Sequence, residues 1–199
     1  MFERTGWSWF FALLLLFGGG AAAWAQVTPA EVTQLHLERT DEGVLLSAAV
    51  RFELPQAVDD ALAKGIPMFF VAEATILRDR WYWYDKRVAH AERHMRLAFQ
   101  PLTRRWRLQV SSSPIGNSGL VLGQMFDSRD EALAAVQRVS RWRIAESGEV
   151  DAEAVHNVDF RFRLDVSQLP RPFQIGAVGQ ADWTILATRT QRLVIEQAK

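Results

Sequence analysis

Residues 66–77 read Ile-Pro-Met-Phe-Phe-Val-Ala-Glu-Ala-Thr-Ile-Leu, and this stretch decides the fold. Apolar and β-favouring residues occupy both alternating sides of the segment, which is typical of a strand buried in the middle of a sheet. Pro67 is tolerated at the start of such a strand. Glu73 is the one charge in the run, so it must find a partner or change its pKa. We expect an arginine beside Glu73; the alternative is an acid/base group in a pocket.

The chain before this strand predicts a hairpin and then a short helix. Residues 32–39 and 44–54 have strand character, and Thr-Asp-Glu-Gly at 40–43 supplies the turn between them. Pro55 suits a first helical position, and Gly65 ends the helix. The apolar face of this helix is predicted to be Val58, Ala61 and Leu62.

The chain after the central strand predicts a second hairpin. Residues 93–100 and 105–111 flank a Pro-Leu-Thr-Arg turn at 101–104. The second of these strands alternates cleanly between apolar and polar residues, so its two sets of side chains face opposite sides of the sheet. The set facing the core is Trp106, Leu108 and Val110, and the set facing outward is Arg105, Arg107 and Gln109.

A second helix is predicted from a capping box at residues 128–131, Ser-Arg-Asp-Glu. In this motif the Ser128 hydroxyl accepts a hydrogen bond from the Glu131 amide, and the Glu131 carboxylate reaches back. The apolar stripe that follows would pack the helix on a sheet. We expect this stripe to be Ala132, Leu133, Val136 and Val139.

Three further segments have strand character, at residues 142–145, 155–166 and 182–196, and Leu-Pro-Arg-Pro at 169–172 separates the last two. About eight strands against two short helices, with turns at the spacing of antiparallel sheets, predict a mainly β fold of the β-rich α+β kind. We expect a single antiparallel, β-sandwich-like domain over residues 26–199.

Residues 1–25 have the three parts of a secretory signal peptide. Arg4 precedes an apolar run at 10–17, and small residues follow. Small side chains at the positions that signal peptidase inspects predict cleavage between Ala25 and Gln26, with a cut two residues earlier as the alternative. An uncleaved anchor is a weaker interpretation, because glycines break the apolar stretch and it barely reaches the roughly 20 residues of a spanning helix. We expect the mature domain in the periplasm.

Composition excludes several classes of protein. The chain has no cysteine, which excludes disulfides, a cysteine-linked lipid and thiolate metal ligands. Its 23 basic and 23 acidic residues balance, whereas nucleic-acid binders usually show a basic excess. We expect no nucleic-acid partner and no cofactor.

One block of the sequence concentrates aromatic and charged side chains. Residues 78–85, Arg-Asp-Arg-Trp-Tyr-Trp-Tyr-Asp, include both tyrosines of the chain. Such rings suit contacts with sugars, peptides or lipid head groups; the alternative is that one ring pair stabilises the strand from the core side. Together with two outward arginines of the second hairpin, the predicted binding surface is Arg78, Arg80, Trp81, Tyr82, Tyr84, Asp85, Arg105 and Arg107.

Arginines also flank aromatic residues at 105–107, 141–143 and 161–163. If these strands were neighbours, the outward arginines would form a ladder for a carboxylate or phosphate. The alternative is a solvated face on which arginines pair with acids such as Asp159 and Asp165.

Motifs for metal binding and catalysis are weak. His90 and His94 would share a face on a helix, but no third ligand is evident, and we expect no metal. Gly-Asn-Ser-Gly at 116–119 matches the nucleophile loop of trypsin-like proteases in four residues only, without recognisable histidine and aspartate partners. We predict no catalytic residue.

Several motifs follow one another along the chain in a recognisable order. They are Gly65-Ile66-Pro67 with Glu73, Arg78-Asp79-Arg80-Trp81-Tyr82-Trp83 with Asp85, Leu102-Thr103-Arg104-Arg105-Trp106, Leu169-Pro170, Pro172-Phe173-Gln174 and Asp182-Trp183. Their order resembles the exported proteobacterial family labelled domain of unknown function 4390, and the resemblance covers nearly the whole mature chain. It implies placement in the periplasm and suggests a membrane sensor kinase as partner, but it implies no activity, since the family has no established catalytic residues.

These patterns predict a non-enzymatic periplasmic binding or interaction module, with an envelope or inner-membrane protein as its partner. The alternative is a cofactor-independent hydrolase acting on an envelope polymer, which requires two carboxylates or a serine and a histidine in one pocket. A third interpretation is an assembly factor with no small ligand.

Overall fold

The computed structural model describes residues 29–79, 86–116, 122–151, 154–177 and 180–194. Within them, nine strands form two antiparallel sheets, accompanied by three α-helices and two short 3₁₀ helices. The predicted β-rich α+β class is therefore confirmed. No helix in the described part of the chain is long and apolar enough to span a bilayer.

The strands are β1 (Glu31–Thr40), β2 (Gly43–Arg51), β3 (Met68–Arg78), β4 (Lys86–Gln100), β5 (Arg105–Ser111), β6 (Gly123–Phe126), β7 (Arg138–Glu146), β8 (His156–Leu164) and β9 (Leu186–Leu193). The helices are α1 (Gln56–Ala63), α2 (Arg129–Val136), α3 (Arg171–Ala177), η1 (Val166–Gln168) and η2 (Ala181–Trp183).

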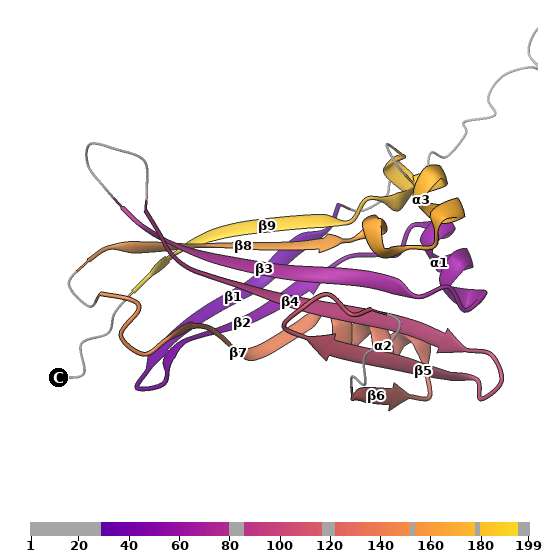
Figure 1. Cartoon of the computed structure of the whole chain (residues 1–199), viewed down its shortest axis with the longest axis horizontal. Coiled ribbons are helices and arrows are strands. Elements are labelled where there is room, and N and C mark those ends of the chain that lie inside the picture. The colour runs from indigo at the N-terminus through magenta and orange to yellow at the C-terminus, as the bar shows by residue number, and fades with distance from the viewer. Residues whose placement is uncertain (1–28, 80–85, 117–121, 152–153, 178–179, 195–199) are drawn as a thin grey trace, which may run out of the picture.

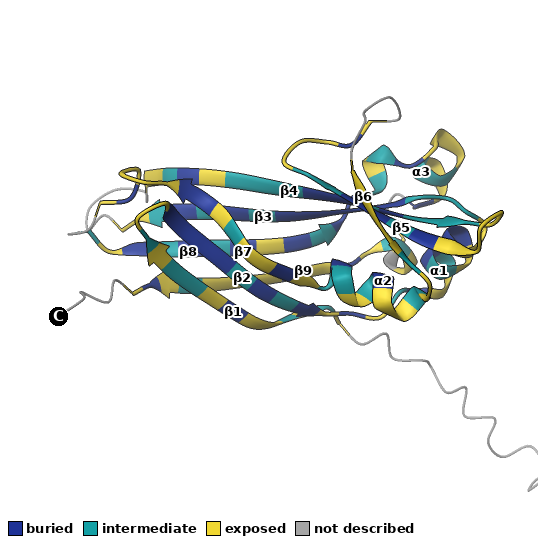
Figure 2. Cartoon of the chain, turned by 90° about the horizontal axis from the view of Figure 1, so that it is seen from below, coloured by how far each residue is buried: buried dark blue, intermediate teal, exposed yellow. Residues whose placement is uncertain are grey.

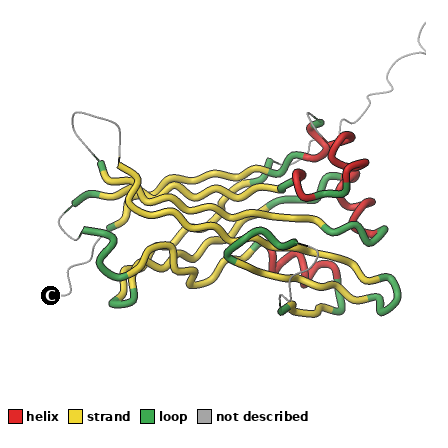
Figure 3. Tube along the Cα trace, viewed as in Figure 1, coloured by secondary structure: helices red, strands yellow, loops and turns green. Residues whose placement is uncertain are grey.

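The two sheets lie one behind the other in an elongated molecule (Figure 1). The three-stranded sheet has the order β1-β2-β7, and the six-stranded sheet has the order β6-β5-β4-β3-β8-β9. Strand β3 stands near the middle of the larger sheet, as the apolar run predicted. All α-helices gather at one end of the molecule, and the turn between β1 and β2 lies at the other (Figure 3).

The core lies between the sheets, where the buried residues concentrate (Figure 2). Phe52, Phe70 and Phe162 pack together there, with ring centroids 5.5–5.8 Å apart. On β3 the alternate residues Phe70, Ala72, Ala74 and Ile76 are fully buried. We call the side of the six-stranded sheet that faces the three-stranded sheet the inner face, and the opposite side the outer face.

Both predicted helices form. The residues Val58, Ala61 and Leu62 of α1 are buried as expected. Ser128 caps α2, because its Oγ accepts a hydrogen bond from the Glu131 amide at 3.2 Å. The first hairpin turns at Asp41 and Glu42, also as predicted.

Three local predictions were wrong. Val139 belongs to β7, because α2 ends at Val136. A third helix, α3, begins directly after Pro170. Strand β9 starts only at Leu186, since the chain first forms η2. Gln109 lies on the outer face as predicted, but it is only 6 % exposed, and its Oε1 accepts from Arg96 Nη1 at 3.1 Å.

Candidate functional site

The predicted binding surface is divided between two distant parts of the molecule. Arg78 pairs in register with Lys86 at the start of β4, whereas Arg107 pairs with Ala98 near its end. Twelve residues of extended chain between Lys86 and Ala98 span about 40 Å. Arg78 therefore does not share a surface with Arg107, nor with Arg105, which lies farther along.

Several other predicted sites lie outside the described residues. These are Arg80, Trp81, Tyr82, Tyr84 and Asp85 of the aromatic block, Ala25 and Gln26 at the signal cleavage site, and Ser118 in the Gly-Asn-Ser-Gly loop.

A cluster that we call the hairpin clamp holds the base of the connection between β3 and β4. Arg78 Nη2 lies 3.4 Å from Asp151 Oδ2. Asn157 Nδ2 donates to Asp79 Oδ1 at 2.6 Å, and the Asp79 amide donates to the Val155 carbonyl at 3.1 Å. The clamp thus joins the end of β3 to the chain that leads from β7 into β8.

The two other predicted arginines support the opposite end of the sheet. Arg105 Nε donates to Asp127 Oδ1 at 2.9 Å. Arg107 packs against β6 so closely that a Cβ placed on Gly123 would lie 2.8 Å from its Nε. Both side chains therefore contact the segment after β5 and are remote from the hairpin clamp.

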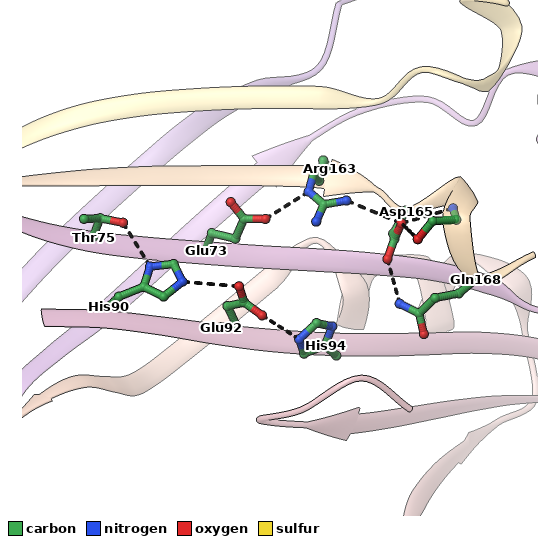
Figure 4. A network of polar contacts seen from close by, with 9 residues as sticks. Glu73, Thr75, His90, Glu92, His94, Arg163, Asp165 and Gln168 are labelled. Atoms are coloured by element: carbon green, nitrogen blue, oxygen red, sulfur yellow. Dashed lines mark hydrogen bonds and ion pairs between the residues drawn. The ribbon is translucent and has the colours of Figure 1, made fainter. Parts of the chain in front are cut away.

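Two groups of polar contacts lie on the outer face of the six-stranded sheet (Figure 4). Arg163 Nε donates to Glu73 Oε1 at 2.9 Å, which confirms the predicted arginine partner of Glu73. Arg163 also lies 3.5 Å from Asp165. Burial would raise the pKa of Asp165, but hydrogen bonds from Gln168 and Ser167, with the charge of Arg163, hold it below its usual range.

Glu92 accepts hydrogen bonds from two imidazoles on its own strand. His90 Nε2 lies 3.2 Å and His94 Nε2 lies 2.9 Å from its two carboxylate oxygens. The bond from His90, assisted by His94, lowers the pKa of Glu92 although burial opposes this shift. Thr75 Oγ1 lies 3.1 Å from His90 Nδ1 and continues this group of contacts onto β3. Glu92 is thus held as an ionised acceptor.

Two carboxylates face each other in this network. Glu73 and Glu92 are register partners on β3 and β4, and like charges directly opposite destabilise a sheet. Arg163 compensates the charge of Glu73, and Glu92 accepts hydrogen bonds from His90 and His94. The sequence analysis singled out Glu73 but missed Glu92. Its signal was the spacing His90, Glu92, His94, because alternate residues of a strand share one side.

No group of three or more histidine, aspartate or glutamate residues is placed to hold a metal ion within the described ranges. His90 and His94 do share a face, but it is the face of a strand, and Glu92 stands between them.

The arginine-flanked strands do not form a ladder of neighbours. Strands β5 and β8 belong to one sheet with β4 and β3 between them, and β7 belongs to the other sheet. On β7, Arg141 pairs with Glu38 at 3.1 Å, and Arg143 lies 3.4 Å from Glu146. Asp165 pairs with an arginine as expected, whereas Asp159 accepts instead from Thr190 Oγ1 at 2.7 Å.

Comparison with known proteins gives a family and no activity. No curated protein and no solved structure matches the chain. One family model, described as Domain of unknown function (DUF4390), matches residues 28–193, which is most of the chain and includes all nine strands. The chain therefore belongs to the DUF4390 family.

Proposed function

We propose that the protein is an exported, non-enzymatic binding module that contacts an envelope protein through the connection between β3 and β4. The observation that carries the proposal is the hairpin clamp. Two side-chain contacts and one backbone hydrogen bond fix the β3 flank of a connection whose sequence contains two tryptophans and two tyrosines. Aromatic side chains on a fixed base are frequent anchors of protein interfaces.

The charges of the clamp support the same use. Arg78 and Asp151 have side chains 45 % and 48 % exposed, so both remain accessible to a partner while they contact each other. Exposed charges at the rim of an interface mainly set the rate and the specificity of association. The aromatic block would then supply the affinity, and the clamp would orient it.

The proposal is tested by replacing aromatic and control residues at opposite ends of β4. A photo-crosslinking residue is placed at exposed Lys86, and crosslinked species are compared in cells. Tyr82→Ser with Tyr84→Ser should remove the crosslinked partner. Arg104→Gln with Arg105→Gln changes exposed arginines about 40 Å away and should leave it unchanged. Retention of the partner by the tyrosine variant would contradict the proposal.

Export is tested separately by the mass of the chain recovered from cells. The three-part pattern of residues 1–25 supports removal of a signal peptide. The mature chain is then expected to begin at Gln26 and to be recovered from the periplasm. A full-length mass in the membrane fraction would instead support an uncleaved anchor.

A second candidate function, hydrolysis of an envelope polymer, is favoured by the facing carboxylates Glu73 and Glu92. The lowered pKa of Glu92 suits a base and opposes a role as the acid. Glu73→Gln with Glu92→Gln should abolish release of soluble fragments from purified peptidoglycan if this function is correct. Equal fragment release with and without the wild-type protein would remove it.

A further inference from the structure

Arginines gather on the outer face of the six-stranded sheet, although the whole chain is balanced. The strand registers place seven arginines and three carboxylates on this side of the described sheet. Three further carboxylates just past strand ends contact outer-face side chains: Asp165 with Arg163 (Figure 4), Asp79 with Asn157 and Asp127 with Arg105. The arginines are Arg87, Arg96, Arg105, Arg107, Arg161, Arg163 and Arg192, and the strand carboxylates are Glu73, Glu92 and Asp159.

Three of these arginines are exposed and have no hydrogen-bond or ion-pair partner among the described residues. They are Arg87 on β4, Arg161 on β8 and Arg192 on β9. The carboxylates nearby are engaged in other contacts: Glu73 accepts from Arg163, Asp159 from Thr190 and Asp79 from Asn157. Within the described part of the chain, the three guanidinium groups therefore remain available to an anion from outside the protein.

The spacing of these arginines suits a ligand with repeating charges. Arg87 and Arg192 lie in one row across the sheet, through Leu77 and Asn157, and are three strand spacings apart. That separation is about 14 Å. Arg161 is four residues along β8 from Asn157, which adds about 13 Å along the strand. One small anion cannot bridge the whole triangle, whereas a polymer can contact each corner.

The surroundings favour a hydrophilic polymer over a protein. The hydroxyl groups of Thr75, Thr188 and Thr190 lie on the same face, and they can hydrogen-bond sugar hydroxyls. Among the described residues, the large exposed apolar side chains on this face stand at its margins, Met125 on edge strand β6 and Leu186 at the start of β9. Protein interfaces usually need apolar or aromatic anchors near their centre.

We propose that the outer face binds an anionic glycan, with Arg87, Arg161 and Arg192 contacting successive charged groups along it. Guanidinium groups bind carboxylates and phosphates in two-pronged geometry, and the threonine hydroxyls would contact the sugar rings between them. This surface and its ligand are distinct from the aromatic connection and the protein partner proposed above.

The test measures binding of polygalacturonate, a glycan with one carboxylate per sugar, by isothermal titration calorimetry at low ionic strength. The binding variant is Arg87→Gln, Arg161→Gln and Arg192→Gln. The control variant is Lys64→Gln, Arg138→Gln and Arg171→Gln, which removes the same charge from exposed positions off this face. We expect affinity to fall by about tenfold or more in the binding variant and by less than about twofold in the control.

Each outcome decides the proposal. Both variants change exposed side chains and should keep the melting temperature of the wild type, which thermal unfolding checks. Equal weakening in the two variants would show unspecific attraction and overturn the proposal, as would no binding by the wild type. Tighter binding of polyglutamate than of polygalacturonate would assign the face to an acidic peptide and overturn it as well. If neutral dextran bound as tightly as polygalacturonate, the arginines would not determine binding, and the proposal would be overturned.

Discussion

Neighbouring residues of β8 face two different environments. Phe162 is fully buried on the inner face, in contact with Phe52 and Phe70. Arg161, one residue earlier, is exposed on the outer face, and Arg163, one residue later, is half-buried in an ion pair with Glu73. The inner face is thus stabilised by removal of apolar surface from water. The outer face is stabilised by compensation of charges, which contributes much less.

This difference shows where the sheet can carry function. The inner face is closely packed, so adding or removing one methylene group there changes the packing of neighbouring side chains. The outer face carries unpaired and mutually compensated charges whose arrangement the core does not require. Selection can therefore change the exposed, unpaired positions of the outer face with little effect on the free energy of unfolding.

The largest expected effect is on the inner face. Phe162→Ala should lower the free energy of unfolding by about 3–5 kcal/mol, because it removes one ring of the three-ring cluster and leaves a cavity. Arg161→Ala, on the same strand, should change it by less than about 0.5 kcal/mol, because the side chain is exposed and has no ion-pair partner among the described residues. Urea denaturation measures both. Equal losses of unfolding free energy in the two variants would contradict the difference between the inner and outer faces.

The next effect is at the end of β8, where the outer face becomes a buried turn. The side chain of Asp165 is 12 % exposed and accepts from the Ser167 amide, Ser167 Oγ and Gln168 Nε2 at 3.1, 2.6 and 2.7 Å. Asp165→Ala should lower the free energy of unfolding by about 2 kcal/mol, because these donors lose a charged acceptor. Asp165→Asn keeps one acceptor oxygen and should lower the free energy of unfolding by less than Asp165→Ala does.

The same carboxylate gives the outer face a pH dependence. The pKa values of Asp165 and Glu92 are lowered in the folded protein, so the unfolded chain takes up protons at higher pH than the folded one. Their contribution is complete above the ordinary pKa values of the unfolded chain, 4.5 for Glu92 and 3.8 for Asp165, and is lost as the pH falls below these values and through the lower folded ones. The melting temperature of Glu92→Gln with Asp165→Asn should fall less steeply with decreasing pH than that of the wild type. An equally steep fall in the variant would contradict these assignments.

A smaller effect is expected from the central ion pair. Glu73 and Arg163 have side chains 20 % and 33 % exposed and are 2.9 Å apart. A double-mutant cycle with Glu73→Gln and Arg163→Met should give a coupling energy of about 1 kcal/mol, because the pair is partly desolvated and also offsets the repulsion between Glu73 and Glu92. A coupling near zero would mean that the network does not stabilise the sheet.

Most of the fold follows from local patterns in the sequence. The apolar run at 66–77 predicted β3, and the capping serine Ser128 predicted α2. The lone charge of Glu73 predicted its arginine partner. Each of these depends on residues within a few positions or on one unmet physical requirement. The error at Val139 has a local cause as well, since an apolar residue three positions after Val136 suits a continuing helix as well as a new strand.

The candidate site was much harder to predict, because it depends on register and on strand length. Arg78 and Arg107 stand near each other in the order of motifs, but β4 runs for fifteen residues and separates them. The pairing of Glu73 with Glu92, and the row from Arg87 to Arg192, arise from contacts between strands far apart in sequence. Alternation shows which residues share a side of one strand, and only the register shows what lies opposite.

The smallest expected effect concerns an ion pair at the margin of the outer face. Arg105 and Asp127 lie at the same 2.9 Å separation as Arg163 and Glu73, but their side chains are 46 % and 82 % exposed. Water and salt screen such a pair, so Arg105→Gln with Asp127→Asn should give a coupling energy below about 0.5 kcal/mol. The two double-mutant cycles thus compare ion pairs of equal separation that differ in burial. A coupling at Arg105 as large as that at Arg163 would mean that distance, and not desolvation, sets the strength of ion pairs on this face.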